Sequence, residues 1–144
     1  MVLLMGLFIL FYNHGMNHWL PDLLRSYGMT PVEAGYWASI PTLFGMIASL
    51  SLPRMATPEW RFKILCGLFI CAAIAALMVL AASGPLLAVG LVLQGMCRGA
   101  MTSISILLLI ESGDGNTNRV GAASGLYFSV GEIGGVLGPM SMGA

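Results

Sequence analysis

Two residues of opposite charge, Arg98 and Glu132, lie inside long apolar stretches of the sequence. An ionisable side chain near the centre of a bilayer is costly to place, so it usually marks a functional site. At 1.5 Å per residue, Arg98 stands ~18 Å and Glu132 ~20 Å from the polar ends of their stretches, and we predict that they meet near the midplane. They would bind a charged ligand, exchange a proton or gate a pathway. The alternative is a structural ion pair that locks two helices.

A polar stripe includes Arg98. Polar residues recur at intervals of four, four and three along this stretch: Gln94, Arg98, Thr102 and Ser105. That spacing puts them on one face of an α-helix, and a face this polar is predicted to line a cavity or the bundle interior rather than lipid. A guanidinium binds carboxylates and other planar anions through two parallel hydrogen bonds. The stripe therefore predicts an anionic organic or inorganic ligand.

Four more polar residues stand near the end of the first apolar stretch, in two pairs with helical spacing: Asn13 with Asn17, and His14 with His18. Two histidines at this spacing can begin a metal site, but no third His, Cys or carboxylate follows nearby. We therefore predict neither a metal site nor a cofactor. Pore lining or hydrogen bonding between helices is the favoured interpretation, and either imidazole is also suited to relay protons.

Small residues indicate close helix packing, because they let neighbouring backbones approach. Seven small or helix-bending residues are predicted to act in packing or gating: Pro41, Gly45, Gly95, Gly99, Gly134, Gly138 and Pro139. Three cysteines lie inside apolar stretches and are interpreted as small core residues: Cys66, Cys71 and Cys97. Their spacing fits neither a zinc site nor a disulfide in a loop.

The stretches that must position these residues are long enough to cross a bilayer. Hydrophobic residues make up 58% of the 144-residue chain and charged residues 8%, which is far from the composition of a soluble domain. Pro21, Pro53 and Gly84 stand between stretches and are predicted to end helices. We expect one transmembrane domain over 1–144, all-α, with roughly five antiparallel helices. They cover about 2–20, 34–52, 64–82, 86–110 and 120–140.

Charge in the breaks predicts the orientation. The second and fourth breaks hold most of the Lys and Arg, as Arg54, Arg61, Lys63 and Arg119, whereas the first break holds Arg25 and the third none. Because positive loops stay in the cytoplasm, we expect a multi-pass protein of the plasma (inner) membrane with a cytoplasmic amino terminus. The bilayer is an expected partner of so apolar a chain. Nucleic acid is not expected as a partner, because six basic residues balance six acidic ones.

Three local patterns resemble the carboxyl-terminal half of major facilitator superfamily transporters. Residues 93–100 are similar to the Arg and Gln-Gly motif of helices four and ten, and residues 134–139 to the GxxxGP pattern of helices five and eleven. Residues 53–54 and 61–63 resemble the basic loop between helices eight and nine. That loop motif lacks its Gly and Asp-Arg step here, so its gating role is not carried over. The five stretches would match helices seven to eleven.

The resemblance implies secondary transport of a small solute by two six-helix halves that rock around a midplane site. Residues 19–22 and 34–36 are also similar to the cyanate and nitrate or nitrite porter branch, which implies small anions and an arginine ligand. The chain would then be a fragment or half-length chain that needs the missing half or a second copy. The alternative is a membrane assembly or structural subunit that does not transport. No enzyme activity is expected, because no catalytic set of residues is placed for it.

Overall fold

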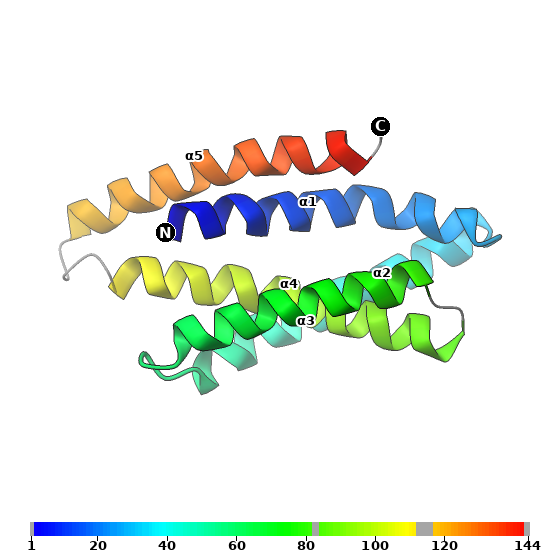
Figure 1. The fold of residues 1–144 in the computed structure, drawn as a ribbon, viewed down its shortest axis with the longest axis horizontal. Helices are drawn as coiled ribbons and strands as arrows, with labels where there is room; N and C mark the ends of the chain where they lie inside the picture. Colours follow the sequence, from blue (N-terminus) through cyan, green and yellow to red (C-terminus); the bar gives the residue numbers. More distant parts are fainter. Residues whose placement is uncertain (1, 82–83, 112–116, 143–144) are drawn as a thin grey trace. The chain divides into compact units, whose positions relative to one another are not determined.

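The computed structural model describes residues 2–81, 84–111 and 117–142. These residues form five α-helices, one for each predicted stretch (Figure 1). The helices are α1 (Val2–Ser26), α2 (Pro31–Met55), α3 (Arg61–Ala81), α4 (Pro85–Glu111) and α5 (Thr117–Met142). No strand occurs within the described ranges, so the predicted all-α class is confirmed.

Helices α1 and α2 both continue past a proline that was expected to end them. Pro21 lies inside α1, which runs on to Ser26, and Pro53 lies inside α2, which runs on to Met55. Proline removes one backbone N–H donor and bends a helix, but membrane helices tolerate it where other groups satisfy the freed carbonyl. The chain leaves α1 through Gly28, whose φ of 86° is readily adopted only by glycine.

The start of α2 is held by a capping box. The Thr30 hydroxyl accepts a hydrogen bond from the Glu33 backbone N–H at 3.3 Å, and the Glu33 carboxylate accepts one from the Thr30 backbone N–H at 2.8 Å. The Thr30 backbone bond is the main reason that the pKa of the exposed Glu33 carboxyl falls below its ordinary value. The box therefore supports this helix start at neutral pH and weakens as the pH falls through that lowered pKa.

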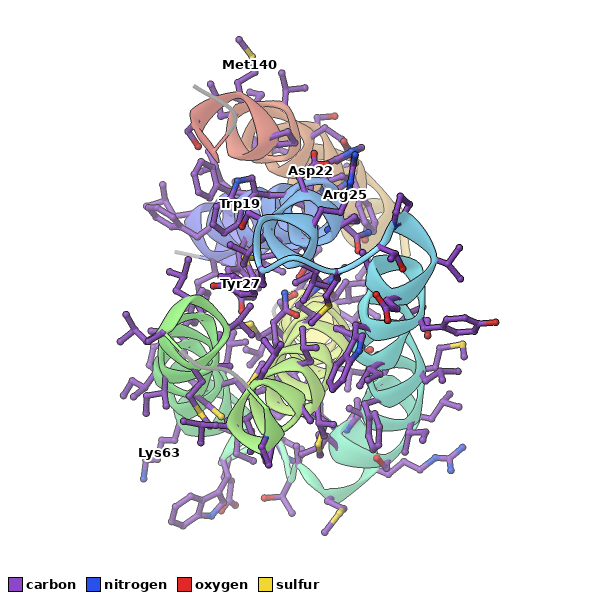
Figure 2. All side chains as sticks on the ribbon, turned by 90° about the vertical axis from the view of Figure 1, so that its right-hand side faces the viewer. Trp19, Asp22, Arg25, Tyr27, Lys63 and Met140 are labelled. Atoms are coloured by element: carbon purple, nitrogen blue, oxygen red, sulfur yellow. The ribbon has the colours of Figure 1, made fainter. Side chains whose placement is uncertain are left out.

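The break after α1 is tied to the end of α3 by Tyr27 (Figure 2). Its hydroxyl donates to the backbone carbonyls of Val79 and Leu80 at 3.0 and 2.9 Å. Carbonyls in the last turn of a helix have no partner within that helix, so this bond satisfies them. The ends of α1 and α3 therefore lie on the same side, as alternating antiparallel helices require.

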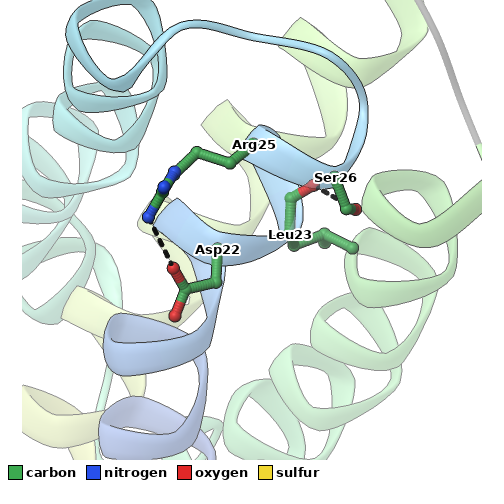
Figure 3. Close-up of polar contacts among 4 residues, drawn as sticks. All are labelled: Asp22, Leu23, Arg25 and Ser26. Atoms are coloured by element: carbon green, nitrogen blue, oxygen red, sulfur yellow. Dashed lines mark hydrogen bonds and ion pairs between the residues drawn. The ribbon is translucent and has the colours of Figure 1, made fainter.

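The last turns of α1 carry polar contacts that are local (Figure 3). Arg25 pairs with Asp22 at 3.5 Å, and the Ser26 hydroxyl donates to the Leu23 carbonyl at 2.7 Å. The two charged side chains are 58% and 73% exposed, so the pair contributes little stability. It belongs to the polar end of the helix rather than to a buried site.

The chain divides into two compact units, and the first comprises Met1–Leu20 with Ser105–Ala144. In this unit α1 and α5 lie side by side (Figure 1). Their contacts advance along both helices in the same direction, from Gly6 with Tyr127 to Leu10 with Gly131 and His14 with Gly135. The two helices are therefore parallel, which agrees with the predicted alternation of directions.

The second unit, Pro21–Ile104, contains α2, α3 and most of α4. Gly95 and Gly99 of α4 lie against the backbone of α2 at Pro41 and Gly45, in the same order along both helices. These two helices are therefore parallel. Gly90 of α4 lies against Met78 and Val79 near the other end of α3, and this pair is antiparallel, as predicted for successive helices.

Much of the surface is apolar. On α3, Ile70, Ile74 and Leu77 are exposed, whereas Ala72 and Ala75 on the other side are buried. Exposed apolar stripes of this kind are suited to lipid rather than water. Among the described residues, three helical segments are long and apolar enough to cross a membrane: Arg61–Ala81, Pro85–Glu111 and Val120–Ser141. The 25-residue α1, which carries the Asn and His pairs, is not among these segments.

Candidate functional site

The candidate site in the second unit is on α4, between its two packing faces. Gly95 and Gly99 face α2, and Gly90 faces α3. Successive residues of an α-helix are about 100° apart around the axis. Gln94 and Arg98 therefore lie together on the strip of α4 between the face that contacts α2 and the face that contacts α3.

Gln94 is the most unusual polar residue of this strip. Its side chain is 0% exposed, and neither its amide nitrogen nor its amide oxygen has a hydrogen-bond partner within the described part of the chain. An unsatisfied buried amide costs about 1–3 kcal/mol, and folded proteins rarely keep one without a use. The predicted stripe is thus buried at Gln94, and this amide has one donor group and one acceptor to offer a ligand.

The other members of the stripe differ from Gln94. Arg98 is half-buried one turn further along the same face. The Thr102 hydroxyl donates back to the Arg98 carbonyl at 3.2 Å, within its own helix. In the first unit the buried Ser105 hydroxyl is 2.6 Å from the Tyr127 hydroxyl of α5. The hydroxyl groups of Thr102 and Ser105 thus bond within the protein, whereas the amide of Gln94 has no hydrogen-bond partner among the described residues.

In the first unit the structure brings together two residues that the sequence had singled out separately, His14 and Glu132. The His14 Nδ1 and the Glu132 Oε2 lie 3.1 and 3.2 Å from the position that a Cβ on Gly135 would occupy. The His14 Nδ1 and the Glu132 Oε2 are therefore close neighbours, because their separation cannot exceed the sum of those two distances. Gly135 makes room for both side chains where α1 and α5 pack together.

The His14 ring has a defined hydrogen bond. Its Nδ1 is 3.1 Å from the Leu10 carbonyl, which can only accept, so Nδ1 is the donor. In the neutral ring, Nε2 is then the basic nitrogen that can take up a proton. His14 is half-buried and Glu132 is exposed. The arrangement provides a proton acceptor beside a carboxylate.

The other polar residues of α1 have different surroundings. Asn13 is half-buried, whereas Asn17 and His18 are exposed. Exposed polar side chains in a membrane helix rarely face lipid, so this surface of α1 is expected to meet water or protein. The two histidines do not share one environment, and the described residues contain no cluster of three possible metal ligands.

The predicted approach of Arg98 to Glu132 remains a prediction, because Arg98 belongs to the second unit and Glu132 to the first. The structure does show the surroundings of the predicted packing residues on α5. A Cβ on Gly134 or Gly138 would meet the backbone carbonyl of Leu7 or Phe11 on α1, and Pro139 follows, half-buried. Any gating role of these residues stays a proposal.

Sequence reasoning did not identify Tyr127. It is fully buried, covers Gly6 and bonds to Ser105. Its sequence signal is a tyrosine in the middle of an apolar stretch, because a buried phenol usually needs a hydrogen-bond partner. The contact between Cys71 and Cys97 was also missed, because the two are 26 positions apart and both were interpreted as core residues.

The long helices and their apolar surface are the features of a multi-pass membrane protein. The profile of the Major Facilitator Superfamily matches residues 1–139, so the chain belongs to the Major Facilitator Superfamily of membrane transporters. It is 29% identical over 133 residues to a quinolone resistance transporter of Acinetobacter baumannii. That match covers 90% of this chain and 30% of the relative. No solved structure is significantly similar to the chain.

Proposed function

We propose that the chain contributes the recognition site for a small anionic solute to a secondary transporter, with Arg98 and Gln94 as the ligands. The buried, unpartnered amide of Gln94 one turn from Arg98 carries this proposal. The guanidinium provides charge and a two-pronged donor. The amide N–H group adds a neutral donor, from which carbonate-like or carboxylate oxygens of the solute can accept a hydrogen bond. Low polarity around the strip strengthens each of these bonds.

The test is Gln94→Leu, which removes the amide at nearly constant volume. We expect transport of nitrate or of a small carboxylate into vesicles to fall about tenfold or more, since one ligand hydrogen bond to a charged group is lost. The thermal stability of the purified protein should stay the same or rise, because an unsatisfied buried amide has been removed. Met101→Leu, a buried apolar exchange on the same helix, is the control and should change neither.

A purely structural amide would give the opposite pair of results. Gln94→Leu would then lower the melting temperature and leave the transport rate per folded molecule unchanged. That outcome would favour the second candidate function, a membrane assembly or structural subunit that does not transport.

Two solute classes suit this site. The resemblance to the cyanate and nitrate or nitrite branch favours small inorganic anions. The relative from Acinetobacter baumannii is a quinolone resistance transporter, which favours a larger aromatic acid, because quinolone antibiotics carry a carboxylate. Uptake or efflux of nitrate and of a quinolone, each measured in competition with the other, separates the two classes.

We propose that protons drive the transport through His14 and Glu132, whose side chains share the space over Gly135. A transport step that passes a proton through this pair makes the wild-type transport rate depend on pH. His14→Gln should flatten this profile, whereas His18→Gln, one turn away on the exposed side of α1, should leave it unchanged. A His14→Gln profile identical to wild type would remove His14 from the coupling step.

Asn13 and Asn17 are proposed to line the aqueous side of the pathway. The other wall is supplied by the remaining helices of a transporter or by a second copy of this chain. We propose a cytoplasmic amino terminus and a location in the plasma (inner) membrane, because Arg54, Arg61 and Lys63 lie around the break between α2 and α3.

A further inference from the structure

Cys71 of α3 and Cys97 of α4 stand at the same level of two antiparallel helices. Gly90 lies against Met78 and Val79, which sets the register of this pair. Cys97 is seven residues after Gly90, and Cys71 is seven residues before Met78. Seven residues are about two helical turns, so both cysteines remain on the contacting faces. The register alone therefore places them opposite each other.

The side-chain contacts agree with this register. The thiols of Cys71 and Cys97 are close enough to interact with each other, and neither cysteine is in a disulfide. Cys97 is 1% exposed and Cys71 is half-buried. Both lie near the middle of segments that are apolar enough to cross a membrane. Cys66 is five residues before Cys71, so it points about 140° away from the pair around α3.

We infer that Cys71 and Cys97 form a dithiol binding site for a soft, thiophilic metalloid, of the class of trivalent organoarsenicals. Sulfur ligands select soft elements, and two thiols on one electrophile give a chelate. The reaction is RAs=O plus two thiols, giving RAs(S-Cys)₂ and water. Two As–S bonds replace the As–O double bond, the two thiol protons leave in the water, and no oxidation occurs. The product is neutral, which matters because a charged adduct would be costly in this apolar location.

The experiment uses phenylarsine oxide with the purified protein, followed by a challenge with excess monothiol. Intact-mass spectrometry should find one arsenical per chain retained by wild type and by Cys66→Ala. Cys71→Ala and Cys97→Ala should each lose it, with apparent affinity lower by about a hundredfold or more, because only a single As–S bond remains. Equal retention by wild type and by both of these variants would overturn the inference, as would loss in Cys66→Ala.

A second measurement uses the wild-type protein alone, so it does not depend on whether the alanine variants fold. The protein is treated with phenylarsine oxide, denatured and alkylated, and the alkylated cysteines are located by peptide mapping. Protection of Cys71 and Cys97 together with alkylation of Cys66 is the expected result. Alkylation of all three cysteines, or protection of a pair that includes Cys66, would contradict the inference. Neither measurement depends on transport, so the dithiol site can fail while the anion site holds.

Discussion

Replacement of Arg98 by lysine is expected to lower the transport of an anionic solute by about tenfold or more. Lysine keeps the charge but loses the planar fork that holds two oxygens of a carboxylate or nitrate at once. A hydrogen bond to a charged group contributes about 1.5–3 kcal/mol, and this sets the size of the effect. The measurement is initial uptake of labelled nitrate, or of a small carboxylate, into vesicles. The loss should be mainly in KM.

Arg25→Lys is the matched control for this substitution. Arg25 is an exposed arginine that pairs with Asp22 in the last turns of α1, so exchanging it tests the chemistry of the side chain away from the site. We expect its transport rate to equal that of wild type. Uptake by Arg98→Lys that stayed at the level of the Arg25→Lys control would show that Arg98 does not recognise the solute.

Replacement of Gly99 by alanine is expected to separate α4 from α2. A Cβ at this position would overlap the backbone carbonyl of Gly45, and a backbone in a packed helix cannot move aside as a flexible side chain can. Overpacking typically costs about 1–3 kcal/mol, and this site should lie at or above the top of that range. Thermal unfolding of the purified protein should begin several degrees lower.

Gly67→Ala makes the same chemical change where there is space. Gly67 is exposed on α3, and no atom lies within 4 Å of the position that its Cβ would take. Because alanine is the better helix former, this variant should be as stable as wild type or more stable by up to about 1 kcal/mol. Equal melting temperatures for the Gly67 and Gly99 variants would contradict the close packing of α4 on α2.

The existence and order of the helices were predictable because each depends on a local property, the length of an apolar stretch. The predicted stretch 86–110 differs from α4, Pro85–Glu111, by one residue at each end. The end of α1 was not predictable, because Pro21 can end a helix or only bend it. The outcome depends on what satisfies the freed carbonyl, and local sequence does not contain that information.

The candidate site was likewise predictable only in part from local sequence. Helical spacing alone placed Gln94 and Arg98 on one face, and the structure buries that face at Gln94. The contact of His14 with the space beside Glu132 depends on the register between α1 and α5, which are more than ninety residues apart along the chain. Spacing within one helix carries no information on that register, so such pairs emerge only from packing.

The most direct test of the anion site is aqueous access to the strip that carries Gln94 and Arg98. Thr102→Cys, one turn beyond Arg98, is made in a variant whose three native cysteines are replaced by alanine, and is treated with a charged thiol reagent. Ile74→Cys, on the exposed apolar face of α3, is the control and should not react. We predict that the thiol introduced by Thr102→Cys is labelled and that nitrate or a small carboxylate slows the labelling. No labelling of this position under any condition would contradict a solute pathway and favour an assembly subunit.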